Sequence, residues 1–317
     1  MKRVLICGAT GFIGKNLVER FSKKEGFQVR AVHFNSSPSY SGDNIEWVRA
    51  DLRDSQDVKR IMEGVDVVLQ YAATTTGAKD IVSKPYIHVT DNAVMNSLLL
   101  REAFEQGIGH FVMPSCTVMY KPSETPLKEE DFNENDEMFH AYYGAGNTKV
   151  YLEKMCKFYA NLGKTRHTVL RQSNIYGAHD KYDLDKSHVF GATITKVMTS
   201  DDKVVVWGTG EEQRDFLYVE DLLDLVELSV DNQAEDYTLI NASFGSSISI
   251  ADLVKTIVKV SEKPLSIEYD SSKPSINTKL AIDNSLAKEV LGWEPKYKLQ
   301  EGIKKTITWY TKNVLDG

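Results

Sequence analysis

The run Gly8–Gly14 contains three glycines spaced three residues apart and directly follows the short apolar segment Arg3–Cys7. Glycine is needed where a chain turns tightly, lets a pyrophosphate approach its backbone and packs a helix against a strand. The next segment, Lys15–Phe21, has helical apolar spacing, so the free N–H groups at its start would point at the phosphates. This strand–glycine–helix order predicts a dinucleotide site. Its predicted residues are Gly8, Thr10, Gly11, Phe12, Ile13 and Gly14.

A second group of reactive side chains follows the apolar run Phe111–Met113. Ser115, Cys116 and Thr117 place two hydroxyl groups and a thiol just beyond the end of this predicted strand. Ligands of open α/β sheets bind beyond the carboxyl ends of the strands. We therefore expect this group to face the bound ligands.

The residues after the second predicted strand, Val29–Val32, bear on the choice of cofactor. NAD-binding folds usually carry an Asp or Glu here that accepts hydrogen bonds from the adenosine ribose. This chain instead has His33 and Asn35, so a 2′-phosphate would meet donors and no negative charge. The pattern favours NADP and leaves NAD as the alternative; His33 could also simply cap the strand end.

Two further strand ends complete the predicted cofactor site. Asp51 and Leu52 follow the third strand, where a carboxylate can accept from an adenine amino group, although a turn aspartate is an equal interpretation. Ala72 and Ala73 follow the fourth strand, and their small side chains would let the backbone approach the cofactor ribose.

Apolar runs alternate with helical segments up to about residue 175. This alternation predicts an α/β fold of the Rossmann type, a doubly wound parallel sheet covered by helices on both faces. Beyond Gly177 the rhythm changes, and we expect helices near 189–199, 250–260 and 299–313 with strands near 204–207 and 265–269. The predicted division is a dinucleotide-binding domain over 1–176 and a smaller α/β substrate lobe over 177–317, part of which returns to the first domain.

Composition excludes several classes of function. The 317 residues are 42% hydrophobic and 26% charged, and the net charge of −7 comes with no basic run, which argues against a nucleic-acid surface. No apolar stretch is long enough for a membrane span or a signal peptide. The three cysteines, Cys7, Cys116 and Cys156, are odd in number and lack metal-ligand spacing, so we predict no metal and a reducing, cytoplasmic setting.

Several motifs along nearly the whole chain resemble the extended short-chain dehydrogenases/reductases that remodel nucleotide sugars. They are Tyr142–Glu153, Arg171–Gly177, Ser187–Val189, Trp207–Arg214 and Leu291–Pro295. Within that family the pattern is most similar to the GDP-L-fucose synthases. The resemblance implies an NADP-dependent enzyme that epimerises and reduces a nucleotide-linked 4-keto-6-deoxy sugar, with GDP as the expected nucleotide.

The resemblance also implies catalytic roles. In the family a tyrosine gives the proton, a lysine lowers the tyrosine pKa and holds the nicotinamide ribose, and a Ser or Thr hydrogen-bonds the keto oxygen. Lys149 matches the lysine, and Ser115 and Thr117 compete for the hydroxyl role. Epimerisation needs a base and an acid on opposite ring faces, which in fucose synthases are a cysteine and a histidine. Cys116 and His188 match them, although one register places Cys116 at the Ser/Thr position.

The tyrosine departs from the family spacing of Tyr-x-x-x-Lys, because Ala145 stands four residues before Lys149. We predict that the helix begins only at Asn147, a good N-cap, so that the preceding residues form an insertion that brings Tyr143 into place. Tyr142 would share the lysine's helix face but lie roughly 10 Å away in a regular helix. Without either tyrosine, the site would epimerise without reducing, or catalyse no redox chemistry.

Further residues are carried over by the same resemblance. Those expected to line the nicotinamide are Gln172, Asn174 and Ile175. Those expected to bind the sugar nucleotide are Asn174, Val189, Lys196, Trp207 and Arg214. Trp207 could stack on a base or sugar, and Arg214 could pair with phosphate.

Two alternatives belong to different functional classes. One is an NDP-sugar 4-epimerase or 4,6-dehydratase with retained NAD, which the missing ribose-binding acid disfavours. The other is a non-catalytic dinucleotide sensor, for which Ala145 is the main support. In either case the family resemblance implies a homodimer, formed through helices that start near Asn92 and Lys149.

Overall fold

The computed structural model of this protein describes residues 1–38, 40–74, 83–184, 187–273 and 278–316, and within them seven parallel strands form one central sheet. In spatial order these strands are β11 (Tyr237–Ala242), β7 (Arg166–Gln172), β5 (His110–Cys116), β4 (Val67–Gln70), β1 (Lys2–Cys7), β2 (Phe27–His33) and β3 (Ile45–Arg49). The chain order reverses between β1 and β4, and ligands of doubly wound sheets bind at such a switch point.

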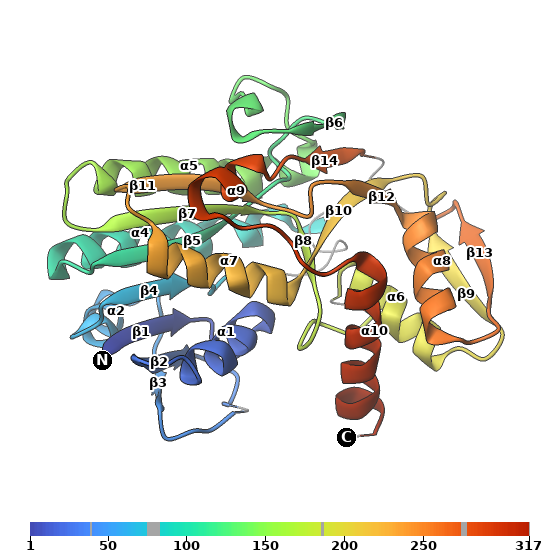
Figure 1. Cartoon of the computed structure of the whole chain (residues 1–317). Helices are drawn as coiled ribbons and strands as arrows, with labels where there is room; N and C mark the ends of the chain where they lie inside the picture. The colour runs from blue at the N-terminus through green and yellow to red at the C-terminus, as the bar shows by residue number, and fades with distance from the viewer. Residues whose placement is uncertain (39, 75–82, 185–186, 274–277, 317) are drawn as a thin grey trace.

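Helices cover both faces of this sheet (Figure 1). One face carries α1 (Phe12–Ser22), α7 (Val219–Asn232) and α9 (Ser285–Leu291), and the other carries α2 (Ser55–Met62), α4 (Thr90–Gln106) and α5 (Tyr143–Ala160). Each helix buries one apolar stripe: Leu17 and Phe21 of α1 pack into one core, and Leu99 and Leu152 pack into the other. The predicted fold class is confirmed, and β11, α7 and α9 show that chain beyond residue 177 joins the large sheet.

A smaller lobe stands at the right of Figure 1. Its strands are β8 (Asn174–Tyr176), β10 (Gln213–Tyr218), β12 (Ser247–Ser249), β9 (Lys203–Trp207) and β13 (Ser266–Asp270). Its helices are α6 (Val189–Thr199), α8 (Ile250–Ser261) and α10 (Leu299–Tyr310), the last followed by a π-helical turn at Thr311–Leu315. Tyr176 and Phe190 stack at the centre of its core, with ring centroids 4.1 Å apart.

A third, small unit pairs β6 (Ser123–Leu127) with β14 (Leu280–Ile282) over a core of Tyr120, Leu127 and Ile282. Short 3₁₀ turns occupy Pro85–His88, Glu129–Asp131 and His140–Tyr142. The last of these directly precedes α5 and positions part of the site.

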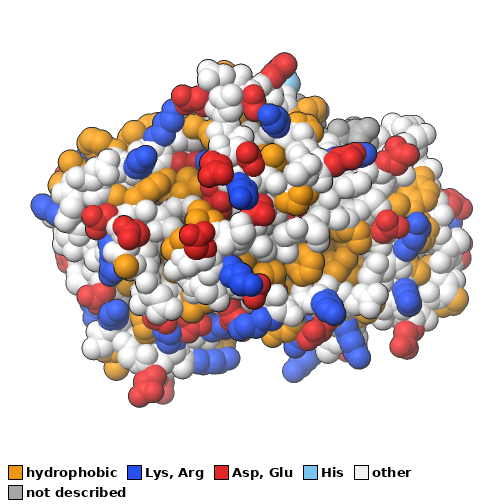
Figure 2. All heavy atoms as spheres, turned by 45° about the horizontal axis from the view of Figure 1, so that its top comes forward, with side chains coloured by type: hydrophobic (Ala, Val, Ile, Leu, Met, Phe, Trp, Pro, Cys, Tyr) orange, Lys and Arg blue, Asp and Glu red, His pale blue; other side chains and the backbone are white. Residues whose placement is uncertain are grey.

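The surface shown in Figure 2 mixes both signs of charge. Acidic and basic side chains alternate over this face and do not gather into a basic patch. Among the helices of the described residues, none combines the length and the apolar character needed to cross a bilayer.

Candidate functional site

A cavity of about 870 Å³ lies at the carboxyl ends of the central strands, where the large sheet meets the smaller lobe. It brings together most of the residues predicted from the sequence. These are Gly8, Thr10, Gly11, Phe12, Ile13, Gly14, His33, Asn35, Asp51, Leu52, Ala72, Ala73, Ser115, Cys116, Lys149, Gln172, Asn174, Ile175, His188 and Val189. The predicted residues outside its lining are Thr117, Tyr143, Lys196, Trp207 and Arg214.

The glycine-rich loop forms one end of this cavity. Gly8 has φ +70°, and a Cβ there would lie 2.6 Å from the carbonyl oxygen of Tyr71. A Cβ at Gly14 would lie 2.0 Å from the carbonyl oxygen of Gly8. The N-cap of α1, Gly11, offers no side chain, so the first N–H groups of the helix remain available to a ligand. This cradle, which any side chain would fill, fits the pyrophosphate of a dinucleotide.

The ends of β2 and β3 form the adjoining wall, where we expect the adenosine. His33 Nδ1 lies 3.1 Å from the carbonyl oxygen of Ser36, and Asn35 lines the cavity beside it. Asp51 accepts two hydrogen bonds from the guanidinium of Arg53, at 2.9 and 2.8 Å, which lowers the pKa of the Asp51 carboxyl. The sequence analysis missed Arg53, although its place two residues after Asp51 was a usable signal.

The three residues at the end of β5 point in different directions. Ser115 Oγ donates to Glu153 Oε1 at 2.5 Å, and Thr117 Oγ1 donates to the carbonyl oxygen of Gln172 at 3.3 Å; both residues are about 4% exposed. Cys116 is half-buried and interacts electrostatically with Lys149. Burial raises the pKa of the Cys116 thiol to about 11, so the group is neutral at physiological pH. Of these three residues, Cys116 therefore has the side chain best placed to meet a substrate.

A buried ion pair supports this strand end from behind. Arg171 donates to both carboxylate oxygens of Glu153, from Nε at 3.0 Å and from Nη2 at 2.8 Å. Arg171 Nη1 also donates to the hydroxyl of Tyr120 and to the carbonyl oxygen of Glu129. Because Ser115 donates to the same Glu153, the network ties β5, β7 and α5 together next to Cys116.

Lys149 projects from α5 toward the same place. Its Nζ donates to the carbonyl oxygen of Pro114 at 2.7 Å, and burial lowers the pKa of its ammonium group. A lysine held in this way is available to the hydroxyl groups of a ribose and to a neighbouring acid.

The start of α5 differs from the sequence prediction. The helix begins at Tyr143, four residues before the predicted Asn147, and Asn147 Nδ2 donates to the carbonyl oxygen of Tyr143 instead of capping the helix. Tyr143 is 64% exposed and lies outside the cavity lining. Tyr142 is half-buried, lines the cavity and interacts electrostatically with Cys116 and Arg214. The 3₁₀ turn before the helix, which the sequence analysis did not foresee, makes this difference.

The smaller lobe contributes three titratable side chains to the cavity wall that faces the large sheet. They are His188, Asp180 and Lys181. His188 is the N-cap residue of α6, and its ring makes no capping hydrogen bond. Desolvation at the cavity wall and the charge of Lys181 lower the pKa of His188, which keeps the imidazole neutral. Asp180, missed by the sequence analysis, lines the cavity nearby, and burial raises the pKa of its carboxyl to about 7.

Three residues predicted to bind substrate lie on the smaller lobe beyond this cavity. Lys196 Nζ donates to the carbonyl oxygen of Val205 at 2.9 Å and lies 5.4 Å from the ring of Trp207, which is 53% exposed. Arg214 Nη1 donates to the carbonyl oxygens of Gln213 and Thr278, at 2.9 and 2.7 Å. The cavity lining thus covers the expected positions of the cofactor and of the sugar. Lys196, Trp207 and Arg214 lie outside this lining, so the nucleotide part of a substrate bound by them would lie outside it as well.

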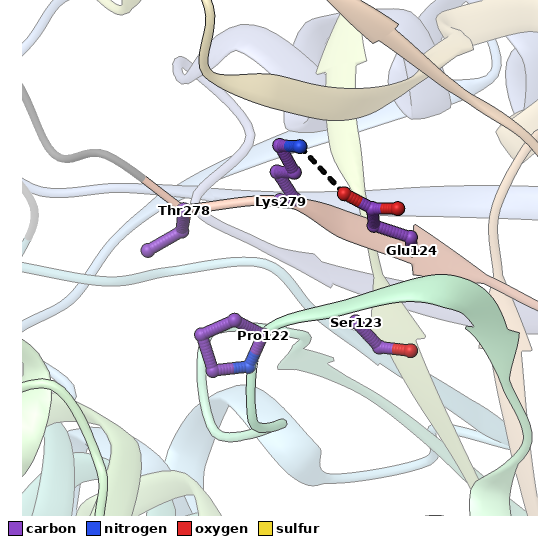
Figure 3. A pocket seen from close by; sticks show the side chains of 5 residues that line it. All are labelled: Pro122, Ser123, Glu124, Thr278 and Lys279. Carbon is purple, nitrogen blue, oxygen red and sulfur yellow. Dashed lines mark hydrogen bonds and ion pairs between the residues drawn. The ribbon is translucent and has the colours of Figure 1, made fainter.

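A second, shallow pocket lies between β6 and the segment before β14 (Figure 3). Its charged side chains, Glu124 and Lys279, pair with each other at 2.5 Å. It shares no lining residue with the large cavity, and its small open surface does not resemble a catalytic site.

Comparisons with known proteins agree with this geometry. Residues 4–242 match the model of the NAD dependent epimerase/dehydratase family. The chain is 25% identical over 315 residues to GDP-L-colitose synthase of Yersinia pseudotuberculosis, which covers 97% of each chain. It is 26% identical over 322 residues to dTDP-4-dehydro-6-deoxy-D-allose reductase of a Streptomyces species, covering 98% of this chain and 96% of that one.

A solved structure shows the same fold. UDP-glucose 4-epimerase of Thermotoga maritima superposes with a TM-score of 0.86 at 24% identity, covering 98% of this chain and 99% of the other. The match to the family model agrees with the glycine cradle and with the lysine on α5. This chain is therefore an enzyme of the NAD dependent epimerase/dehydratase family, the extended short-chain dehydrogenases/reductases that act on nucleotide sugars.

Proposed function

We propose that this enzyme epimerises a nucleotide-linked 4-keto-6-deoxy sugar by acid–base chemistry and reduces its keto group with NADPH. The observation that carries the proposal is that one cavity joins a dinucleotide cradle to Lys149, Cys116 and His188. Relatives named for 4-dehydro-6-deoxy sugar reduction and for colitose synthesis align over almost the full chain, which supports the same chemistry. A GDP-L-fucose synthase of Sinorhizobium fredii also aligns, at 25% identity over 323 residues, whereas a fucose-synthase activity of this enzyme remains a prediction.

The protein groups of this site suit both steps. When bound, the nicotinamide cofactor supplies the hydride for the keto carbon. Lys149 would hold the nicotinamide ribose and stabilise negative charge near the new alkoxide. His188, kept neutral, can remove a proton beside the ketone, and Cys116, kept as a thiol, can return one. Their opposite pKa shifts suit a base and an acid on two walls of one cavity.

A turnover assay tests the proposal. We expect the purified enzyme to consume NADPH with GDP-4-keto-6-deoxymannose, followed by the loss of absorbance of the reduced nicotinamide. A parallel assay with the dTDP-linked 4-keto-6-deoxy sugar determines which base is preferred, because GDP- and dTDP-linked relatives both align. Absence of NADPH consumption with both substrates would exclude the reductase function.

We also propose a preference for NADP over NAD. The cavity wall at His33 and Asn35 carries no carboxylate at the end of β2, and the nearby Asp51 is paired with Arg53. Replacement of Asn35 by aspartate is expected to weaken NADPH binding about tenfold, because the new charge would repel the 2′-phosphate. Titration of NADPH and NADH into wild type and variant measures the change.

The control for this variant is Asn161→Asp, which adds the same charge at an exposed position at the far end of α5. It should leave both affinities unchanged. Tighter binding of NADH than of NADPH by the wild type would contradict the proposed cofactor preference.

We further propose a homodimer formed by α4 and α5. These helices lie side by side and expose Val94, Tyr151 and Phe158, which are 40%, 42% and 51% accessible. Apolar groups gathered on one pair of helices are typical of a subunit interface. Phe158→Glu should convert the dimer to a monomer, whereas Val290→Glu on α9, 41% exposed, should not. Light scattering at micromolar concentration measures the molar mass of the wild type and of both variants. A monomeric wild type would refute the interface.

A further inference from the structure

We propose that Tyr142 donates the proton to the new sugar hydroxyl. The family spacing would place a tyrosine for this role four residues before Lys149, where this chain has Ala145. This inference rests on the proposed function of the site. It assigns a reacting group to a residue in the turn before α5, and it assigns none to the neighbouring Tyr143.

The helix itself leaves space for such a group. Ala145 and Lys149 are four residues apart on α5, so their side chains share one helix face, and both line the cavity. The methyl group of Ala145 has no ionisable proton to donate, and it fills little volume. Any phenol that serves Lys149 must therefore come from outside this helix face.

Two glycines allow the preceding turn to fold back over the helix. A Cβ at Gly146 would lie 2.2 Å from the sulfur of Met138, and a Cβ at Gly144 would lie 2.8 Å from a methyl group of Val89. The close approach of Met138 to α5 positions the following segment, in which Tyr142 N–H donates to the carbonyl oxygen of Phe139 at 2.8 Å. The unusual Gly-Ala-Gly sequence thus accounts for a phenol inside the cavity.

The surroundings of Tyr142 suit a proton donor. Its side chain is half-buried and interacts with the Cys116 thiol, which in turn interacts with Lys149. Arg214, held by two carbonyl oxygens, places a positive charge near the phenol that would stabilise a phenolate. Burial has the larger effect and raises the pKa of Tyr142, so the phenol stays protonated at neutral pH.

In the proposed reduction, bound NADPH would supply the hydride for the keto carbon and become NADP⁺, and the π pair of the C=O bond would move to oxygen. The O–H bond of Tyr142 breaks as its proton passes to that oxygen, which leaves a sugar hydroxyl, NADP⁺ and a phenolate. Solvent then returns a proton to the phenolate.

The test compares Tyr142→Phe with Tyr143→Phe, two identical changes at adjacent residues. Tyr142→Phe should lower kcat for the keto reduction by about 10²-fold or more, and Tyr143→Phe should stay close to wild type. Titrations should show that both variants bind NADPH and the sugar nucleotide like wild type, because only a hydroxyl group is removed. Equal losses in the two variants, or a Tyr142→Phe variant with more than half the wild-type kcat, would overturn the assignment.

The pH profile adds a readout that a structural role would not affect. Turnover needs both the phenolic proton of Tyr142 and the charge of Lys149, whose pKa burial lowers, so wild-type kcat should be level through neutral pH and fall at alkaline pH as two groups lose protons. Tyr142→Phe should fall with the loss of one proton only, because Lys149 remains; a two-proton decline in this variant would mean that another group is the donor. A wild-type enzyme that turns over no keto sugar would overturn the proposed function and this role with it. An active wild type together with a Tyr142→Phe variant that keeps more than half of its kcat would overturn this role alone.

Discussion

Replacement of Lys149 by methionine is expected to lower kcat/KM for the keto sugar by about 10³-fold. The ammonium group lies among Pro114, Cys116 and the other groups at the end of β5, where charge would develop during the proposed reduction. Methionine matches the length of the apolar part of the lysine side chain, so it keeps those contacts but removes the charge and the hydrogen-bond donor. The fold should therefore survive while the ribose anchor and the stabilisation of the alkoxide are lost.

The matched control is Lys154→Met, five residues further along the same helix. The side chain of Lys154 is 60% exposed and pairs with Glu134 at the surface, away from the cavity. This variant should keep wild-type kinetics in the same NADPH-oxidation assay. A Lys149→Met enzyme with more than a tenth of wild-type kcat/KM would remove Lys149 from the mechanism.

Replacement of Arg171 by methionine is expected to lower the free energy of unfolding by about 3–5 kcal/mol. Both side chains of the Arg171–Glu153 pair are nearly buried, at 5% and 6% exposed. The variant would leave the Glu153 carboxylate without its partner in an apolar interior and would also leave Tyr120 without a donor. Because Glu153 also holds Ser115, the end of β5 beside Cys116 should loosen as well.

Urea unfolding at neutral pH measures this effect. The control is Lys255→Met, which breaks the surface pair with Asp252 and should leave the unfolding curve almost unchanged, since exposed ion pairs contribute little. If Arg171→Met unfolds at the same urea concentration as wild type, the buried network does not stabilise the site.

The regular parts of the fold could be predicted because local periodicity determines them. The helix expected near residues 189–199 is found at Val189–Thr199, and the one expected near 250–260 is found at Ile250–Ser261. The glycine loop was predictable for a similar reason, since Gly8 has a positive φ and the Cβ clash at Gly14 is with Gly8 in the same short loop. These features need no knowledge of distant residues.

The wall of the cavity that holds the proposed catalytic residues depends on contacts that sequence spacing does not reveal. Arg171 and Glu153 meet because β7 and α5 pack together, and Tyr142 reaches the cavity because Met138 folds against Gly146. The helix start predicted at Asn147 was wrong. The helix begins at Tyr143, because the residues before Asn147 are held by this tertiary packing. Asp180 was missed since its importance comes from burial, which follows only from the arrangement of the lobes.

The arrangement of the lobes would allow one site to serve both proposed reactions. The large sheet supplies the dinucleotide cradle and Lys149, and the smaller lobe supplies His188 and Asp180 on the facing wall. A sugar ring held between them would face a hydride source on one side and an acid–base group on the other.

The most direct test of this account is transfer of deuterium to the sugar nucleotide from NADPH that carries deuterium in place of both hydrogens at nicotinamide C4. We predict that, with a nucleotide-linked 4-keto-6-deoxy sugar, mass spectrometry will find one deuterium in the product for each NADPH oxidised, located at sugar C4 by NMR. A product without deuterium, or no product with either the GDP-linked or the dTDP-linked sugar, would contradict hydride transfer between a dinucleotide and a sugar in this cavity.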